Sequence, residues 1–442
     1  MNQIKGDYVK RGTDAKVAII GAGPSGITAA KHLIQVGISN LVVFEKNNQV
    51  GGNWVYSPDP SHSSVYESTH IISSKKFSQY HDFPMPDDYP DYPGHKLLLK
   101  YFQDYATHFG VDKYIKFNTT VNKTKLNADQ TWTVETDNGE DIFDYLIIAN
   151  GHHWDPRYPN YPGEFTGEYL HSHLYRTHFP FKDKRVLIIG GGNSACDITV
   201  DICRHASYTG LSWRRGYYVV PKFMMGSPPD QFIAKMRWLP EVIQRTINRI
   251  SLRIMVGKYS SYGLPNPDHK LLSSHPIANS QLLYYLRHGE IHPKPDVERF
   301  EGKMVHFKDG STEEYDTIVV ATGYKISFPF LEEKIPNFTD IDVPLYMRMY
   351  TPKFPTMVII GLVQPQGCIW PLSDTQAQVF ANYIVGNYDF PENVQDLIDK
   401  ELREHKKKYV ESPRHSTEVN YHKLQKQLFK AVPKSAPKWS TS

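Results

Sequence analysis

The hydrophobic positions of this chain fall into short apolar runs that end in glycine and are followed by helical patterns. The two clearest runs are Lys16–Ile20 and Arg185–Ile189. Further strands are expected over residues 41–45, 145–149, 317–321 and 357–360. Strands that alternate with helices in this way are typical of βαβ units, so the pattern predicts an α/β fold built on parallel sheets.

Four other segments depart from this alternation. Residues 82–93 and 153–163 are rich in Pro and Tyr, and we expect an irregular excursion in the first and a connection between domains in the second. Residues 234–258 combine apolar and basic positions at helical spacing. They form either a helix that lies on an anionic membrane surface or, in the favoured interpretation, a domain-packing helix with a solvated basic face. From residue 401 onward we expect a peripheral helix and a frayed end.

The composition of the chain excludes several classes of protein. The 442 residues carry 50 Lys and Arg against 47 Asp and Glu, and the net charge of +3 argues against a dedicated nucleic-acid binder. No apolar run reaches the roughly 18 residues of a membrane-spanning helix, and residues 1–15 lack the apolar core of a secretory signal. The three cysteines include no CxxC pair, which excludes a disulfide framework and a four-cysteine zinc site. We therefore expect a cytoplasmic protein.

The first glycine cluster has the pattern of a dinucleotide-binding loop. It is Gly21-Ala-Gly23-Pro24-Ser25-Gly26, between a strand and a helix. The first glycine permits a tight turn, the second lets the backbone approach a pyrophosphate, and the third allows the helix to pack closely on the sheet. Glu45 stands 19 residues after Gly26, where a carboxylate accepts hydrogen bonds from a ribose. This context favours a bound dinucleotide over a glycine-rich turn without a ligand.

A second copy of the pattern is Gly190-Gly-Gly192-Asn193-Ser194-Ala195. Its third position is alanine, which still permits close packing. No acidic residue takes the place of Glu45. Instead Arg214 and Arg215 follow the next strand, and Arg214 stands 24 residues after Gly190. Arginine suits the 2′-phosphate of NADPH through charge-assisted hydrogen bonds, and a solvated basic turn is the alternative.

Two dinucleotide sites of opposite charge preference indicate hydride transfer from NADPH to a tightly held FAD. Disulfide reductases share this arrangement of sites, but they need a cysteine pair that this chain does not have. The two loops do not define what the reduced flavin does next.

The residues between the two loops resemble a family signature. The run Phe165-Thr-Gly-Glu-Tyr-Leu-His171-Ser-His-Leu-Tyr175 matches FxGxxxHxxxY, by which flavin-containing monooxygenases are known. Segments similar to that family also occur, in order, at 44–46, 51–54, 82–88 and 321–324, and the resemblance spans residues 17–379. The similar Baeyer–Villiger monooxygenases carry Trp where this chain has Tyr175. Even within the family, His171 looks structural and holds two domains in register.

The resemblance implies an α/β fold with two Rossmann-like dinucleotide-binding domains, the NADPH domain inserted into the FAD domain. The FAD domain would comprise residues 1–163 and 315–442, and the NADPH domain, with a helical insertion, residues 164–314. It also implies the cofactor contacts. For FAD these are Gly21, Gly23, Pro24, Ser25, Gly26, Glu45, Asn53 and Trp54, with His62 and Val121 as weaker candidates. For NADPH they are Gly190, Gly192, Asn193, Ser194, Arg214 and Arg215. Gln364 would open a segment leading, through Asp374, into a helix whose N-terminus points at the flavin ring.

The activity that the resemblance implies is NADPH- and O₂-dependent oxygenation through a flavin C4a-hydroperoxide, with transfer of one oxygen atom to a soft nitrogen or sulfur centre. Ile72 departs from the family, which usually has Asn at that position beside Ser73. Isoleucine neither donates nor accepts a hydrogen bond, which puts coupled turnover in doubt. Baeyer–Villiger oxygenation of ketones and an uncoupled NADPH oxidase or redox-sensing flavoprotein stay open as alternatives. The sequence also leaves open which amine, sulfide or ketone is the substrate and whether the protein is a homo-oligomer.

Overall fold

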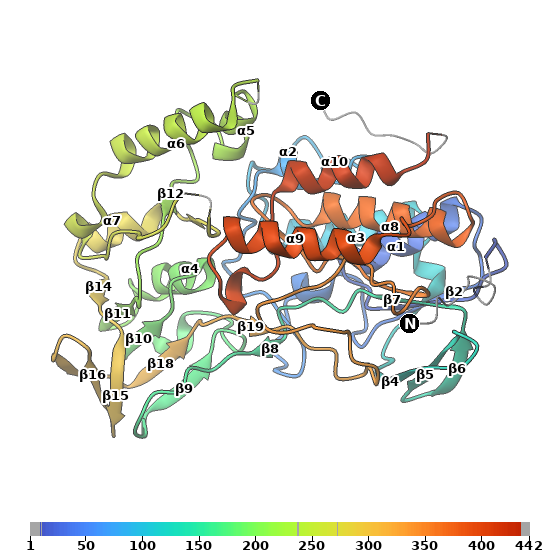
Figure 1. The fold of residues 1–442 in the computed structure, drawn as a ribbon. Helices are drawn as coiled ribbons and strands as arrows, with labels where there is room; N and C mark the ends of the chain where they lie inside the picture. Colours follow the sequence, from blue (N-terminus) through green and yellow to red (C-terminus); the bar gives the residue numbers. More distant parts are fainter. Residues whose placement is uncertain (1–8, 10, 237, 272, 435–442) are drawn as a thin grey trace. The chain divides into compact units, whose positions relative to one another are not determined.

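The computed structural model describes residue 9 and residues 11–236, 238–271 and 273–434. The chain forms two compact units (Figure 1). Unit 1 comprises Met1–Val55, Lys75–His152 and Ile326–Ser442, and unit 2 comprises Tyr56–Ser74 and His153–Lys325. The α/β fold class is confirmed, because each unit is built on its own parallel sheet.

Unit 1 is organised around a five-stranded parallel sheet with the order β20-β7-β1-β2-β3. All residues of β1 are buried, and β1 pairs in parallel with β2 on one side and β7 on the other. Each expected strand is present, within one residue at its ends. The strands are β1 Val17–Ile20, β2 Leu41–Phe44, β3 Ile115–Lys116, β7 Tyr145–Ile148 and β20 Met357–Ile359.

The other elements of unit 1 pack around this sheet or extend from it. An antiparallel three-stranded sheet consists of β4 Val121–Leu126, β5 Trp132–Thr136 and β6 Gly139–Phe143. The helices are α1 Pro24–Gln35, α2 Lys75–Ser78, α3 His95–His108, α8 Trp370–Ile384, α9 Val394–Lys408 and α10 Tyr421–Ala431. Every residue of α8 is buried, so this helix is part of the core. The expected irregular segment, 82–93, contains no helix or strand, and the last residues of the expected frayed end lie outside the described part of the chain.

Unit 2 repeats the parallel arrangement with the sheet order β14-β11-β10-β18-β9. Its strands are β9 Glu168–His171, β10 Arg185–Ile189, β11 Tyr208–Ser212, β14 His292–Lys294 and β18 Thr317–Val320. Smaller pairs and a three-stranded antiparallel sheet are formed by β8 Asp155–Pro156 with β19 Tyr324–Lys325, β12 Val219–Val220 with β13 Ile277–Ala278, and β15 Val297–Glu301, β16 Met304–Phe307 and β17 Thr312–Glu314. The helices are α4 Asn193–Ile202, α5 Pro229–Ala234, α6 Glu241–Val256 and α7 Gln281–Arg287.

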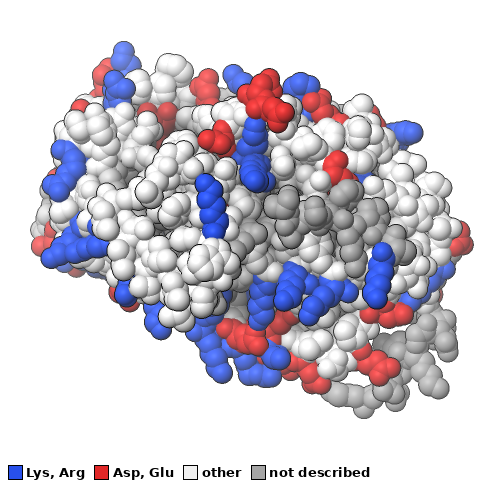
Figure 2. Space-filling model, turned by 90° about the horizontal axis from the view of Figure 1, so that it is seen from above, with Lys and Arg blue, Asp and Glu red and all other residues white. Residues whose placement is uncertain are grey.

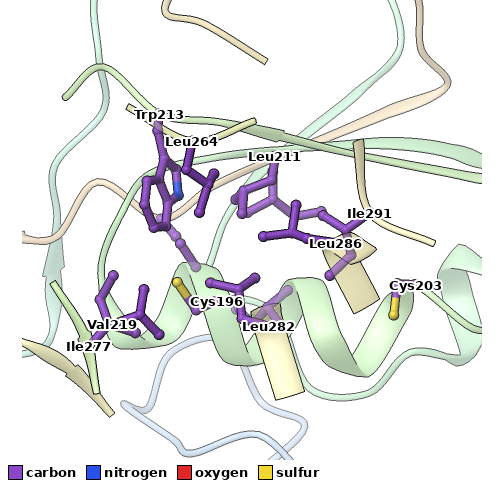
Figure 3. Close-up of a cluster of buried hydrophobic side chains, with 14 of the residues drawn as sticks. Cys196, Cys203, Leu211, Trp213, Val219, Leu264, Ile277, Leu282, Leu286 and Ile291 are labelled. Carbon is purple, nitrogen blue, oxygen red and sulfur yellow. The ribbon is translucent and has the colours of Figure 1, made fainter. Parts of the chain in front are cut away.

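The core of unit 2 lies between β10, β11, α4 and α7. Figure 3 shows Cys196 and Cys203 within a cluster that includes Leu211, Trp213 and Leu282. All three cysteines of the chain are buried and none is in a disulfide. They serve as small apolar core residues.

Residues 56–74 belong to unit 2, whereas the sequence analysis assigned them to the first range, 1–163. The reason is a set of long-range hydrogen bonds that no local pattern reveals. The Arg176 guanidinium donates to the Ser57 carbonyl, and the Glu67 amide donates to the Arg176 carbonyl at 2.8 Å. The assignment of the ranges to FAD and NADPH stays a prediction.

Charged side chains of both signs are interspersed on the face of the molecule that Figure 2 shows, as the small net charge leads one to expect. Among the described residues, none of the helices combines the length and the apolar character needed to cross a bilayer.

A buried ionic cluster joins α1 to α8 within unit 1. Lys31 Nζ lies 2.8 Å from Asp82 Oδ2 and 3.0 Å from Asp374 Oδ1, and His32 Nε2 lies 2.9 Å from the same Asp374 oxygen. The Thr28 hydroxyl also donates to Asp374. Burial opposes the charge of Asp374, but its contacts with His32, Lys31 and Thr28 hold its pKa well below the usual range. Burial, and next the charge of Lys31, lower the pKa of His32.

We expect Asp374→Asn to lower the free energy of unfolding by about 3–5 kcal/mol, because the change leaves the buried Lys31 ammonium without half of its counter-charge. Urea titration at neutral pH measures this loss. The matched control is Asp389→Asn, which breaks an exposed pair with Arg11 and should cost less than about 1 kcal/mol. Equal losses in the two variants would contradict a stabilising role for the buried charge.

The same cluster predicts a pH dependence of stability. Because the pKa of Asp374 is depressed in the folded state, its contribution is fully present above the unfolded value of about 4 and is lost as the pH falls toward the folded value. Wild-type stability should therefore fall more steeply on acidification than that of Asp374→Asn. Parallel curves would contradict the assignment.

Candidate cofactor-binding sites

The loop after β1 brings the start of α1 so close to the sheet that no side chain fits between them. Gly21 has φ +103°, a conformation that favours glycine, and a Cβ there would lie 2.6 Å from the Ala149 carbonyl oxygen. A Cβ at Gly26 would lie 1.8 Å from the Gly21 carbonyl oxygen. Pro24 opens α1 and no side chain caps its start, so the positive end of the helix dipole faces the loop and suits a diphosphate there.

A second pair of glycines lies beside this loop. A Cβ built on Gly23 would have the Cα of Gly52 as its nearest atom, at 3.4 Å. Gly52 starts the short 3-10 helix η1, Gly52–Trp54, which carries the predicted FAD ligands Asn53 and Trp54. The Trp54 ring lies 5.5 Å from that of Trp370, at the start of α8. Glycine at these positions therefore lets the loop after β1, α1 and η1 approach one another at backbone distance, which is the arrangement that a dinucleotide-binding loop requires.

Glu45 is held at the end of β2 by backbone donors. Its Oε2 accepts from the Ala22 amide at 2.6 Å, and its Oε1 accepts from the Asn47 amide at 2.8 Å. The carboxylate is buried against the glycine loop. An ionised carboxylate only accepts hydrogen bonds, which suits contact with ribose hydroxyls.

The remaining predicted FAD ligands are distributed over the fold. Ser25, on α1, lies next to Gly361, because a Cβ at Gly361 would meet the Ser25 hydroxyl. Val121 is the first residue of β4 in unit 1. Gln364 begins β21 (Gln364–Pro365), which pairs with β22 (Glu418–Val419), and its amide donates to the Thr417 carbonyl at 2.8 Å. His62, by contrast, lies in the 56–74 segment of unit 2, with its Nδ1 3.4 Å from Asp59.

The loop after β10 repeats the close approach in unit 2. Gly190 has φ +145°, and a Cβ there would lie 2.4 Å from the Ala321 carbonyl oxygen. Gly192 precedes α4, which has no side-chain cap at its start. The Asn193 side-chain oxygen accepts from the Ala278 amide at 2.9 Å, whereas the Ser194 side chain is exposed. This helix start is thus also suited to a diphosphate.

Arg214 and Arg215 lie at the same edge of the sheet as this loop. Ile189 pairs in parallel with Ser212, so the chain leaves β10 and β11 at adjacent positions. The Arg214 side chain is exposed, and the Arg215 guanidinium lies 5.4 Å from the centre of the Tyr217 ring. An arginine at this edge fits a 2′-phosphate.

The segment that carries Ile72 and Ser73 is tied to α4. The Tyr66 hydroxyl donates to Asp197 Oδ2 at 3.1 Å, and the Asn279 amide donates to Asp197 Oδ1 at 2.7 Å. At the other end of the segment, the Ser74 amide donates to Asp230 at 2.7 Å. Ile72 is partly buried and Ser73 is buried.

The residues of the FxGxxxHxxxY signature also belong to unit 2. The Tyr175 hydroxyl donates to Asp201 at 2.6 Å, and its ring lies edge-on to that of Tyr66 at 5.7 Å. His171 accepts from the His173 amide at 3.0 Å, so its other ring nitrogen, 3.1 Å from the Gly323 carbonyl, is the donor. Burial lowers the pKa of His171 to about 4. A neutral ring between two backbone groups fits the expected structural role.

Sequence reasoning missed Tyr66, Asp197 and Asn279 as the residues that hold the segment of Ile72. One feature of the sequence could have indicated this role. Asp197 follows the second glycine loop by about one helical turn, and with Asp201 it is an acidic residue on α4. Burial raises the pKa of Asp197, and its hydrogen bonds from Asn279 and Tyr66 oppose that rise.

Comparisons with known proteins agree with this geometry. Residues 14–437 match the family model described as flavin-binding monooxygenase-like. Flavin-containing monooxygenase 5 of Rattus norvegicus is 33% identical over 431 residues, covering 92% of this chain and 80% of that protein. Dimethylaniline monooxygenase [N-oxide-forming] 2 of the same species is 34% identical over 415 residues, covering 89% and 77%.

A solved structure extends the likeness to the fold. The cyclohexanone monooxygenase from Rhodococcus sp. Phi1, bound to NADP⁺, superposes with a TM-score of 0.71 at 16% identity, covering 95% of this chain and 98% of that one. Its fold contains two dinucleotide-binding domains, which confirms the fold that the family resemblance implies. The chain thus belongs to the flavin-binding monooxygenase-like family, and it is an oxidoreductase that uses FAD, NADP(H) and O₂ to oxygenate small molecules.

Proposed function

We propose that this enzyme transfers one oxygen atom from O₂ to soft nitrogen or sulfur centres of small molecules, with NADPH as the electron donor. The observation that carries the proposal is Tyr175, where the similar Baeyer–Villiger monooxygenases have Trp. Its hydroxyl bond to Asp201 and its ring contact with Tyr66 make this tyrosine a packed part of unit 2. A relative named for N-oxide formation, 34% identical over 415 residues, supports the same activity.

The proposed FAD site is the backbone around Gly21, Gly23 and Gly52, with Glu45 as the acceptor for ribose hydroxyls. Its support is the close backbone approach that only glycine permits and the start of α1, which no side chain caps. FAD, when bound, supplies the redox chemistry that links NADPH to O₂. Asn53 and Trp54 are proposed to contact it from η1, with Ser25, Val121 and Gln364 as further candidates.

The proposed NADPH site consists of the loop Gly190–Ser194 and the 2′-phosphate contact of Arg214. The helix start binds the diphosphate through backbone N–H groups, and Arg214 distinguishes NADPH from NADH by charge. Arg215 is proposed to assist from its position beside Tyr217.

Ile72 and Ser73 are proposed to border the reacting centre. Ile72 offers no hydrogen bond to a developing charge, but its apolar side chain excludes water. The Tyr66–Asp197 hydrogen bond keeps this segment attached to α4, whose first turn is the proposed diphosphate site. The segment therefore has a stable position relative to the NADPH loop of the same unit.

Product analysis tests the proposed activity. NADPH oxidation should be measured with tertiary amines, organic sulfides and ketones, while products and H₂O₂ are quantified together. We expect N-oxides or S-oxides as the main products. Esters from ketones as the main products would instead establish Baeyer–Villiger oxygenation, and H₂O₂ alone would establish an uncoupled oxidase.

We expect Arg214→Ala to lower kcat/KM for NADPH by roughly 10- to 150-fold. This range corresponds to the loss of one hydrogen bond to a charged group, which is worth about 1.5–3 kcal/mol. NADH has no 2′-phosphate, so its kcat/KM should barely change. The control is Arg204→Ala, which removes an exposed arginine that lies beyond the end of α4. An equal loss with NADPH and NADH would show that Arg214 is structural.

We expect Ile72→Asn to lower the fraction of consumed NADPH that appears as H₂O₂. The added amide can donate a hydrogen bond worth about 0.5–3 kcal/mol, which lengthens the lifetime of the oxygenating species by up to roughly 100-fold. Simultaneous assays of NADPH and H₂O₂ measure this fraction, and Ile72→Val, which keeps an apolar side chain, is the control. More H₂O₂ from Ile72→Asn than from wild type would show that water exclusion matters more than the missing amide.

A further inference from the structure

Each glycine loop contacts the segment that follows the next strand of its sheet, but the two loops use different side chains. In unit 1 the second residue of the loop is Ala22, whose amide donates to Glu45 at 2.6 Å. In unit 2 the equivalent residue is Gly191, and it faces the ring of Tyr217. A Cβ built on Gly191 would lie 2.0 Å from a ring carbon of Tyr217. The ring therefore packs directly on the backbone of the proposed diphosphate loop.

Gly191 and Tyr217 are complementary in size. The φ of Gly191 lies outside the left-handed region, so its backbone conformation is open to other residues. In unit 1 Ala22 is fully buried, which shows that a loop of this kind accepts an inward-pointing Cβ. What requires glycine at position 191 is thus the space that the ring occupies.

The same ring contacts both neighbours of Arg214 in the sequence. Tyr217 is buried, and its ring lies edge-on to that of Trp213, with the ring centres 5.3 Å apart. The Arg215 guanidinium lies 5.4 Å from the centre of the Tyr217 ring. Trp213 is itself part of the core cluster shown in Figure 3. The ring of Tyr217 therefore holds the turn that carries Arg214 relative to both the core and the loop.

We propose that Tyr217 is a positioning residue for NADPH, because its ring sets the separation between the diphosphate loop and Arg214. This inference rests on the proposed NADPH site. The diphosphate and the 2′-phosphate of NADPH are attached to one ribose, so their separation varies little and the protein has to match it. NADH lacks the second phosphate and requires no such match. Tyr217 thus contributes to the preference for NADPH over NADH although it carries no charge.

The first test compares the dissociation constants of NADP⁺ and NAD⁺, measured by isothermal titration calorimetry on the FAD-loaded enzyme. We expect Tyr217→Ala to reduce the preference for NADP⁺ by roughly three- to ten-fold, the loss for one misplaced hydrogen bond. The KM of NADPH should rise by a similar factor, with a smaller effect on kcat. Tyr217→Phe keeps the ring and should keep the preference. An equal loss in Tyr217→Phe would overturn the proposal, because the hydroxyl rather than the ring would then be responsible.

An exchange of size between the two positions separates positioning from general stability. In the wild-type background Gly191→Leu displaces the ring and should lower the preference for NADP⁺. In the Tyr217→Ala background the same leucine enters vacated space and should raise the preference, so the sign of its effect reverses. A leucine that lowers the preference equally in both backgrounds would contradict the proposal.

The matched control is Tyr218→Ala, which removes the neighbouring aromatic ring. The Tyr218 hydroxyl donates to the His269 carbonyl at 2.9 Å, and the centres of the two rings are 5.4 Å apart. We expect a lower melting temperature with an unchanged preference for NADP⁺. Equal losses of preference in Tyr218→Ala and Tyr217→Ala would refute a specific role for Tyr217.

Arg214→Ala, measured alongside, distinguishes a failure of this inference from a failure of the proposed NADPH site. An unchanged preference for NADP⁺ in Arg214→Ala would overturn the site and the inference with it. A selective loss in Arg214→Ala with none in Tyr217→Ala would overturn only the role of Tyr217.

Discussion

The structure depends on how closely a helix start can approach the end of a β-strand. At Gly26 even one methyl group would reach 1.8 Å from the Gly21 carbonyl oxygen, so α1 lies at a distance that only glycine permits. This approach directs the backbone N–H groups of the first helical turn at the loop, and it fixes the direction of the whole helix. In unit 2, Ala195 takes the place of Gly26, and a Cβ at Gly190 would lie 3.4 Å from the Ala195 methyl group. The second loop achieves a similar arrangement with slightly more room.

The direction of α1 has consequences far along the chain. Its interior presents Thr28, Lys31 and His32 to Asp374 on α8, more than 340 residues away in sequence. Because these side chains are buried, the ionic contacts are stable only if the two helices keep their spacing. The same helix whose start is the proposed phosphate site thus anchors the C-terminal part of the chain to unit 1. Packing and the proposed cofactor site are linked through one rigid element.

The strands and both glycine loops could be predicted from the sequence, because they depend on local periodicity and on the few residues that tolerate a tight turn. The membership of residues 56–74 in unit 2 could not, since it depends on Tyr66–Asp197 and Arg176–Ser57 contacts between distant segments. The burial of Lys31 could not be predicted from the sequence either, because a lysine on a helix is usually solvated. On α6 the pattern showed an apolar and a basic stripe, but the face that packs includes Asn248 and is less apolar than the face left exposed.

The three buried cysteines affect how well this enzyme resists oxidation. Enzymes that activate O₂ release some H₂O₂, and the thiolate is the form of cysteine that peroxide attacks. Burial raises the pKa of Cys203 to about 12, which keeps its thiol protonated at neutral pH. Cys196 and Cys368 are buried as well. With all three thiols buried, the cysteines are poor targets for the oxidant that leakage would generate.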